Sequence, residues 1–208
     1  MMVLSEYIEK YKVNGGRCLV LGLAPSLNEY LSLNDHRLFE IGVNNIKSVY
    51  TPDAVLVCDP KSSFNGKDMD YEDTPFFTPH PEQWPQCRNI ISYGFGGYNL
   101  LNFDSNFGSD LINTGHTSVY CALILAAYLG YDRIGMCGVD ITSPGHVYDT
   151  NDKKPHELSF MLGKINKEFS ELYSALLQKG IKIYNLSDKS AVTAFPKKTT
   201  EEFINGNY

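Results

Sequence analysis

LVLGLAPSLNEYL, residues 19–31, is the stretch that decides the fold, because an apolar run here meets a glycine and then a helical pattern. A short run that is apolar throughout is typical of a strand buried on both faces of a parallel sheet. Ser26 and Glu29 have the S-x-x-E spacing of a helix capping box, and Gly22 permits a tight turn before them. The stretch therefore predicts a strand, a turn and a helix whose free N–H groups favour an anion.

The alternation of strand and helix continues along the chain. Apolar runs predict the strand described above, at residues 17–23, and further strands at residues 38–46, 53–60, 133–140 and 181–187. Helical patterns occupy residues 1–12, 115–131 and 158–180. Such alternation predicts an α/β fold, a Rossmann-like three-layer sandwich with a mainly parallel sheet. We expect the 208 residues to form a single domain.

Residues 60–112 interrupt this pattern. The segment is rich in Pro, Gly, Asn and aromatic residues and shows neither helical nor strand periodicity. A structureless stretch of this length is uncommon unless it covers a functional site or contains short elements. We therefore expect an irregular insertion, or lid, over the edge of the sheet. Its aromatic side chains are also consistent with a homo-oligomer.

Composition narrows the class of protein. A hydrophobic share of 43% and a charged share of 20% are ordinary for a soluble globular protein. The net charge of −6 does not indicate nucleic-acid binding, which usually relies on a cluster of basic residues. The sequence shows neither a signal-peptide pattern nor an apolar run long enough to span a membrane. The five cysteines lack C-x-x-C spacing and are expected to be reduced core residues, which favours a cytoplasmic location.

Several candidate binding residues follow the predicted strands. In open α/β sheets, ligands bind beyond the carboxyl ends of the strands. This rule selects the turn that contains Gly22 and Ser26, and the side chains of Asn44, Asp59 and Asp140. The carboxylates of Asp59 and Asp140 are also suited to a Mg²⁺ ion that bridges phosphates, because Mg²⁺ usually takes only one or two protein carboxylates.

A second candidate site opens the helix predicted at residues 115–131. Thr117 and Ser118 supply hydroxyl groups next to free helix N–H groups, and His116 precedes them. The loop after the strand at residues 133–140 adds His146 and Tyr148, which are side chains suited to acid and base chemistry. The sequence thus predicts two anion-binding helix starts and a catalytic loop.

These motifs resemble a known group of enzymes. LVLGLAPSL, VNN, PDAVLVCDP and TSVYCALILAAYLGYDRIGMCGVDI followed by HVYD are similar to motifs of the bacterial sialyltransferases of glycosyltransferase family 42. They also resemble the related Rossmann-like family of MptE-like 6-hydroxymethylpterin diphosphokinases. The likeness extends over about residues 17–150.

The resemblance implies a role for most of the candidate residues. It implies that Asn44 and the turn with Gly22 and Ser26 bind a nucleotide, that Thr117 and Ser118 lie against it, and that Tyr148 hydrogen-bonds the leaving phosphate. The chain differs from the sialyltransferases in carrying Leu23 for an asparagine, Gly115 for a basic residue and Thr142 for a second tyrosine. Asp59 replaces an asparagine of the sialyltransferases and favours the diphosphokinase branch.

Three functions follow as hypotheses. The first is a glycosyltransferase that moves a sugar from a CMP- or UDP-linked donor to an unidentified acceptor, with Tyr148 and His116 or His146 stabilising the leaving group. The second is a Mg²⁺-dependent diphosphokinase in which Asp59 and Asp140 hold the metal. The third is a nucleotide-binding module without catalytic activity.

Overall fold

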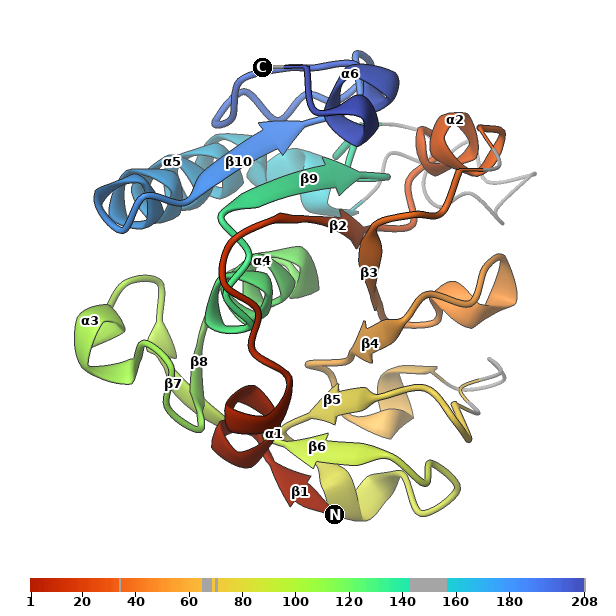
Figure 1. The fold of residues 1–208 in the computed structure, drawn as a ribbon, viewed down its shortest axis with the longest axis vertical. Helices are drawn as coiled ribbons and strands as arrows, with labels where there is room; N and C mark the ends of the chain where they lie inside the picture. The colour runs from red at the N-terminus through yellow and green to blue at the C-terminus, as the bar shows by residue number, and fades with distance from the viewer. Residues whose placement is uncertain (34, 65–68, 70, 143–156, 208) are drawn as a thin grey trace.

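The computed structural model describes residues 1–33, 35–64, 69, 71–142 and 157–207. Within these residues, eight parallel strands form the main sheet (Figure 1). In spatial order they are β1 (Met2–Val3), β6 (Ile90–Ser92), β5 (Phe76–Thr78), β4 (Ala54–Leu56), β3 (Phe39–Val43), β2 (Arg17–Leu21), β9 (Arg133–Cys137) and β10 (Lys182–Asn185). The α/β class and the parallel sheet predicted from the sequence are confirmed.

Helices cover both faces of this sheet (Figure 1). One face packs against α1 (Leu4–Tyr11), α4 (Ser118–Tyr128) and α5 (Leu162–Gln178). The other packs against α2 (Leu27–Leu31) and α6 (Thr200–Asn205). Short 3₁₀ turns occupy Ile46–Ser48, Lys61–Phe64, Pro81–Gln83 and Glu157–Met161. The described helices include none that is both long and apolar enough to cross a membrane.

The strands divide their side chains between two cores. In β2, Cys18 and Val20 face the core that contains α4, whereas Leu19 and Leu21 face the core that contains α2. Successive side chains of a strand point to opposite faces, so a strand buried on both faces must be apolar at every position. This requirement explains why β2 appears in the sequence as an uninterrupted apolar run.

Helix α4 is buried around its whole circumference. A second, two-stranded parallel sheet of β7 (Gly94–Tyr98) and β8 (Leu111–Thr114) lies beyond it, next to the short helix α3 (Phe103–Asn106). The Tyr128 hydroxyl donates to the carbonyl groups of Asn106 and Leu111, at 2.9 and 3.1 Å. The main sheet covers one side of α4, and β8 of the second sheet covers another. The residues of α4 must therefore be small or apolar on every face of the helix.

Residues 60–112 differ from the expectation. The prediction of an irregular insertion over the sheet edge is wrong for β5 and β6, which extend the main sheet, and the segment also supplies β7 and α3. Strands of three residues are too short to show a period of two, so the sequence pattern could not reveal them. The helix predicted at residues 1–12 begins at Leu4, because Met2 and Val3 pair with Ile91 and Ser92 of β6.

Candidate functional site

The strand order reverses between β2 and β9. From β2 the chain proceeds to β3 on one side, and β9 and β10 lie on the other, so the carboxyl ends of β2 and β9 flank the switch point. The turns that follow these two strands are in direct backbone contact. The Gly22 amide donates to the Cys137 carbonyl and the Ala24 amide donates to the Gly138 carbonyl, both at 2.8 Å. A Cβ on Gly22 would lie 2.3 Å from the Gly138 carbonyl oxygen. Gly22 is therefore required for the close approach of the two turns.

Asp140 ties the same turns together from inside the protein. Its side chain is buried, and it accepts hydrogen bonds from the Ser26 amide (3.1 Å), the Ser26 hydroxyl and the Ser187 hydroxyl (3.0 Å). Ser187 follows β10, so the carboxylate joins the ends of three neighbouring segments. A buried carboxyl group whose oxygens accept three hydrogen bonds is a stable arrangement away from water.

The capping box predicted at Ser26 and Glu29 is not formed. Ser26 has helical backbone angles, φ −64° and ψ −14°, and its hydroxyl donates to Asp140 instead of accepting from the helix. Glu29 pairs with Lys189, with 2.7 Å between Oε1 and Nζ. The prediction of a capping box is wrong because a distant carboxylate, invisible to local spacing, binds the hydroxyl group.

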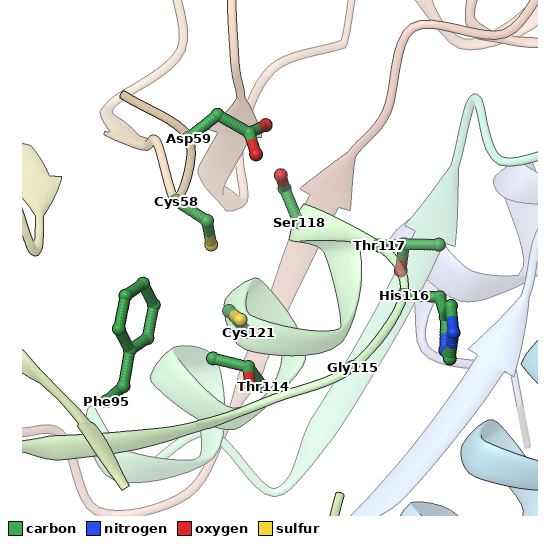
Figure 2. Close-up of a pocket in the computed structure, with 9 residues that line it drawn as sticks. All are labelled: Cys58, Asp59, Phe95, Thr114, Gly115, His116, Thr117, Ser118 and Cys121. Carbon is green, nitrogen blue, oxygen red and sulfur yellow. The ribbon is translucent and has the colours of Figure 1, made fainter. Parts of the chain in front are cut away.

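A pocket of about 250 Å³ lies at the carboxyl end of β4, against the start of α4 (Figure 2). The segment after β4 supplies one wall, β7 supplies Phe95, and the end of β8 leads into α4. The residues that line it are Cys58, Asp59, Phe95, Thr114, Gly115, His116, Thr117, Ser118 and Cys121. Four of the predicted site residues, Asp59, His116, Thr117 and Ser118, thus meet in one cavity.

The start of α4 has the geometry of an anion site. Thr117 has an extended backbone and caps the helix, because its hydroxyl oxygen accepts from the Tyr120 amide at 3.2 Å. This satisfies one of the N–H groups that the first turn of a helix leaves without an intrahelical partner, and the turn lies at the positive end of the helix dipole. The Ser118 side chain points toward Asp59 across the pocket (Figure 2).

Asp59 stands opposite this helix start. Partial removal from water raises the pKa of its carboxyl group above the usual value, and the nearby His80 opposes the shift. A carboxylate that faces an anion site would repel a phosphate group unless a proton or a cation neutralised it.

The inner wall of the pocket contains two thiol groups. Cys58 accepts a hydrogen bond from the Tyr93 hydroxyl at 3.3 Å, and Cys121 contacts the Asn113 carbonyl at 3.6 Å. Two effects raise the pKa of the Cys121 thiol. The larger is a hydrogen bond with Cys58, and the second is removal of the thiol from water. All five cysteines are free, as predicted, but no pattern in the sequence indicates that Cys58 and Cys121 line a cavity.

His116 is held by a residue that sequence reasoning missed. Its ring Nδ1 lies 2.6 Å from Glu168 Oε1, and its backbone amide donates to Glu168 Oε2 at 3.1 Å. Glu168 lies in α5, where it is buried beside Ile165, Phe169 and Leu172. A charged residue on the apolar face of an amphipathic helix was the signal that could have identified it.

Asn44 directly follows β3 and has an unusual backbone conformation. Its φ is 55°, in the left-handed region, and its side-chain Oδ1 is buried without a hydrogen-bond partner among the residues that the structure describes. Its backbone amide donates to the Leu56 carbonyl at 3.1 Å, and its own carbonyl accepts from Tyr71 at 2.8 Å. An unsatisfied buried oxygen calls for an explanation, and a ligand that donates to it is one.

The predicted site residues therefore fall into three groups. Asp59, His116, Thr117 and Ser118 line the pocket. Asn44 is outside the lining and follows β3, the strand paired with β4. Gly22, Ser26 and Asp140 are engaged in contacts that join the turns after β2, β9 and β10. His146 and Tyr148 lie outside the described residues.

Comparison with solved structures identifies the architecture. The sialyltransferase CstII from Campylobacter jejuni in complex with cytidine-5'-monophosphate superposes with a TM-score of 0.56 over 94% of this chain and 89% of that one. This chain shares the fold of that structure. The monofunctional α-2,3-sialyltransferase Cst-I from C. jejuni gives a TM-score of 0.56 over 95% of this chain and 85% of that one. Sequence identities are 16% and 17%, so the likeness is one of fold.

A larger glycosyltransferase shares the same fold. The MAf glycosyltransferase from Magnetospirillum magneticum AMB-1 matches 96% of this chain with a TM-score of 0.58 and 12% identity. The chain spans only 38% of that protein's length. No family model and no curated protein sequence matches the chain.

Proposed function

We propose that this protein is a nucleotide-sugar-dependent glycosyltransferase whose donor is a CMP-linked sugar. The observation that carries the proposal is the pocket at the start of α4, where a capped helix terminus meets the carboxyl end of β4. Structures with the same fold hold CMP, and one also holds a trisaccharide acceptor. A cytoplasmic location, expected from the sequence, is part of the proposal.

The donor phosphate would bind at the first turn of α4. The N–H groups of that turn, the Ser118 hydroxyl and the helix dipole together favour an anion, and α4 is fixed in place by burial on every side. A rigid helix allows a phosphate group to bind without ordering the protein, which reduces the entropic cost of binding. Tyr148, which the family resemblance assigns to the leaving phosphate, remains part of the proposed catalytic loop.

Isothermal titration calorimetry with CMP, UDP and ATP tests the proposal directly. We expect saturable CMP binding that does not require a divalent metal, together with release of CMP from a CMP-linked sugar. Absence of CMP binding would contradict the proposal.

The buried Oδ1 of Asn44, which has no hydrogen-bond partner among the described residues, is the second feature that supports a nucleotide. A ribose hydroxyl or a base amino group could donate to this oxygen and remove the cost of leaving it unsatisfied. The left-handed backbone of Asn44 costs little for asparagine and nothing for glycine.

Replacing Asn44 with glycine therefore separates binding from stability. Glycine keeps the backbone conformation and removes only the side chain, so we expect the free energy of unfolding to change by less than about 0.5 kcal/mol. CMP affinity should fall about tenfold through loss of one hydrogen bond. Asn102→Gly is the matched control, because Asn102 also has a left-handed backbone, with φ 56°, and is exposed outside the pocket. Equal CMP affinities in the two variants would contradict a ligand role for Asn44.

The Mg²⁺-dependent diphosphokinase hypothesis receives no support from the carboxylates. Asp140 is buried, its oxygens accept three hydrogen bonds from Ser26 and Ser187, and it does not line the pocket with Asp59. The pair does not fit a shared Mg²⁺ site.

Replacing Asp59 with asparagine distinguishes the glycosyltransferase hypothesis from the diphosphokinase hypothesis. For the glycosyltransferase, loss of a negative charge opposite the phosphate site should tighten metal-free CMP binding by about fivefold at low salt. For the diphosphokinase, the same change should abolish metal-dependent ATP binding. Titrations with and without EDTA give the answer, and Asp73→Asn, which alters an exposed carboxylate outside the pocket, is the control for net charge. A weaker affinity for CMP in Asp59→Asn alone would count against our assignment.

A further inference from the structure

Glu168 is a buried carboxylate whose partners come from the rim of the pocket. Its side chain is 6% exposed, and a carboxylate withdrawn from water to this extent must be compensated by hydrogen bonds or opposite charge. The Tyr98 hydroxyl donates to Oε1, the His116 ring lies 2.6 Å from the same oxygen, and the His116 amide donates to Oε2. Both oxygens of the carboxylate are thus directed at residues of β7 and of the loop before α4.

The surrounding residues leave space for this carboxylate. A Cβ on Gly115 would lie 3.1 Å from Glu168 Oε2 and 2.9 Å from the Tyr120 ring, so a side chain at this position would crowd both. Lys164 lies over the Tyr98 ring at 5.7 Å, which places a cation on the outer side of the same cluster. The cluster of Tyr98, His116 and Glu168 is therefore fixed by contacts from three separate elements.

We propose that Glu168 is the positioning residue that holds His116 as the general base of the transfer reaction. This inference rests on the proposed glycosyltransferase function. With Nδ1–H donating to Glu168, Nε2 carries the lone pair, and this nitrogen lies 3.2 Å from the Tyr98 hydroxyl. The carboxylate also stabilises the imidazolium that forms when the ring accepts a proton.

The proposed step balances as a simple displacement. The acceptor oxygen forms a bond to the anomeric carbon of the donor sugar, while the bond from that carbon to the phosphate oxygen breaks. The electron pair of the broken bond leaves with CMP, and the proton of the acceptor hydroxyl moves to Nε2 of His116. Water serves as the acceptor when the donor is hydrolysed, so the step can be followed without knowledge of the natural acceptor.

The first measurement tests the positioning itself and does not depend on any substrate. A long-range ¹H–¹⁵N spectrum of the wild-type protein, with the His116 signals assigned by their loss in His116→Asn, should show Nδ1 protonated and Nε2 unprotonated. Glu168→Gln should change this pattern, whereas Glu171→Gln, three residues further along α5, should leave it unchanged. A His116 ring protonated mainly at Nε2 in the wild type would overturn the proposal.

The second measurement is CMP release from CMP-linked sialic acid. Glu168→Gln should lower kcat about 100-fold with the donor KM changed less than about threefold, because the residue acts on proton transfer and not on donor binding. Glu168→Asp should recover part of the loss, and Glu171→Gln should match the wild type. Unfolding midpoints identify any variant that has failed to fold, and Glu168→Asp then carries the comparison.

The outcomes separate this inference from the function on which it rests. If the wild type binds and hydrolyses the donor but Glu168→Gln retains full kcat, the role of Glu168 is overturned and the glycosyltransferase proposal stands. If the wild type binds no CMP, both proposals are overturned. Loss of kcat in Glu168→Gln together with the expected change in the His116 spectrum supports the inference.

Discussion

Replacement of Gly22 by alanine is expected to lower the free energy of unfolding by about 3 kcal/mol, through overpacking of two backbones. The new Cβ would lie 2.3 Å from the Gly138 carbonyl oxygen and 2.8 Å from the Val139 side chain. Neither the carbonyl nor the strand behind it can move without disturbing the bonds that the amides of Gly22 and Ala24 donate across the switch point. Urea unfolding, followed by circular dichroism, measures the loss.

Gly163 provides the matched control for this substitution. It lies in the first turn of α5, and a Cβ added there meets nothing within 4 Å. Gly163→Ala should therefore stabilise the protein by about 0.5 kcal/mol, because alanine restricts the unfolded chain and favours the helix. If Gly22→Ala unfolds at the same urea concentration as the wild type, the turns after β2 and β9 are not in the contact described.

Asp140→Ala is the second substitution with a large expected effect. It removes an acceptor of three hydrogen bonds and leaves the Ser26 amide, the Ser26 hydroxyl and the Ser187 hydroxyl without their partner, at a cost of about 3 kcal/mol. Asp140→Asn should recover part of this loss, because the serine hydroxyls can rotate and accept from the new amide group. Thermal and urea unfolding of both variants measure the difference.

A surface carboxylate supplies the comparison for Asp140. Asp104 is 88% exposed and pairs with Lys179 at 2.8 Å, and Asp104→Ala should change stability by less than about 0.5 kcal/mol. Equal stability of Asp140→Ala and Asp104→Ala would show that the turns after β2, β9 and β10 do not depend on the buried carboxylate.

The sequence revealed those parts of the site that depend on local pattern. Thr117 and Ser118 were identified because a hydroxyl pair opens an apolar helix, and the structure places Thr117 as the cap of α4. Asp59 was selected by its position after a strand, and it does line the pocket with them. Glu168 was missed, although its place among the apolar residues of α5 marks it as buried.

The contacts of Ser26 and Asp140 could not be obtained in this way. Ser26 and Asp140 lie 114 positions apart in the chain, so no spacing rule relates them. Ser26 has the sequence signature of a helix cap, but its hydroxyl group donates to the buried Asp140 carboxylate instead. A charge-assisted hydrogen bond of this kind is stronger than a neutral one to the helix backbone. Both residues were assigned to ligand binding, and the structure shows them bonded to each other.

The sequence by itself determined the α/β class, because a strand buried on both faces must be apolar throughout and a helix enclosed on all sides must be apolar around its circumference. These requirements are local, and β2 and α4 satisfy them in consecutive residues. Only the tertiary structure decided that β5 and β6 extend the sheet, that Gly22 meets Gly138, and that Glu168 reaches His116. Each of these depends on residues brought together by the folded chain, and pairing between distant segments leaves no period in the sequence.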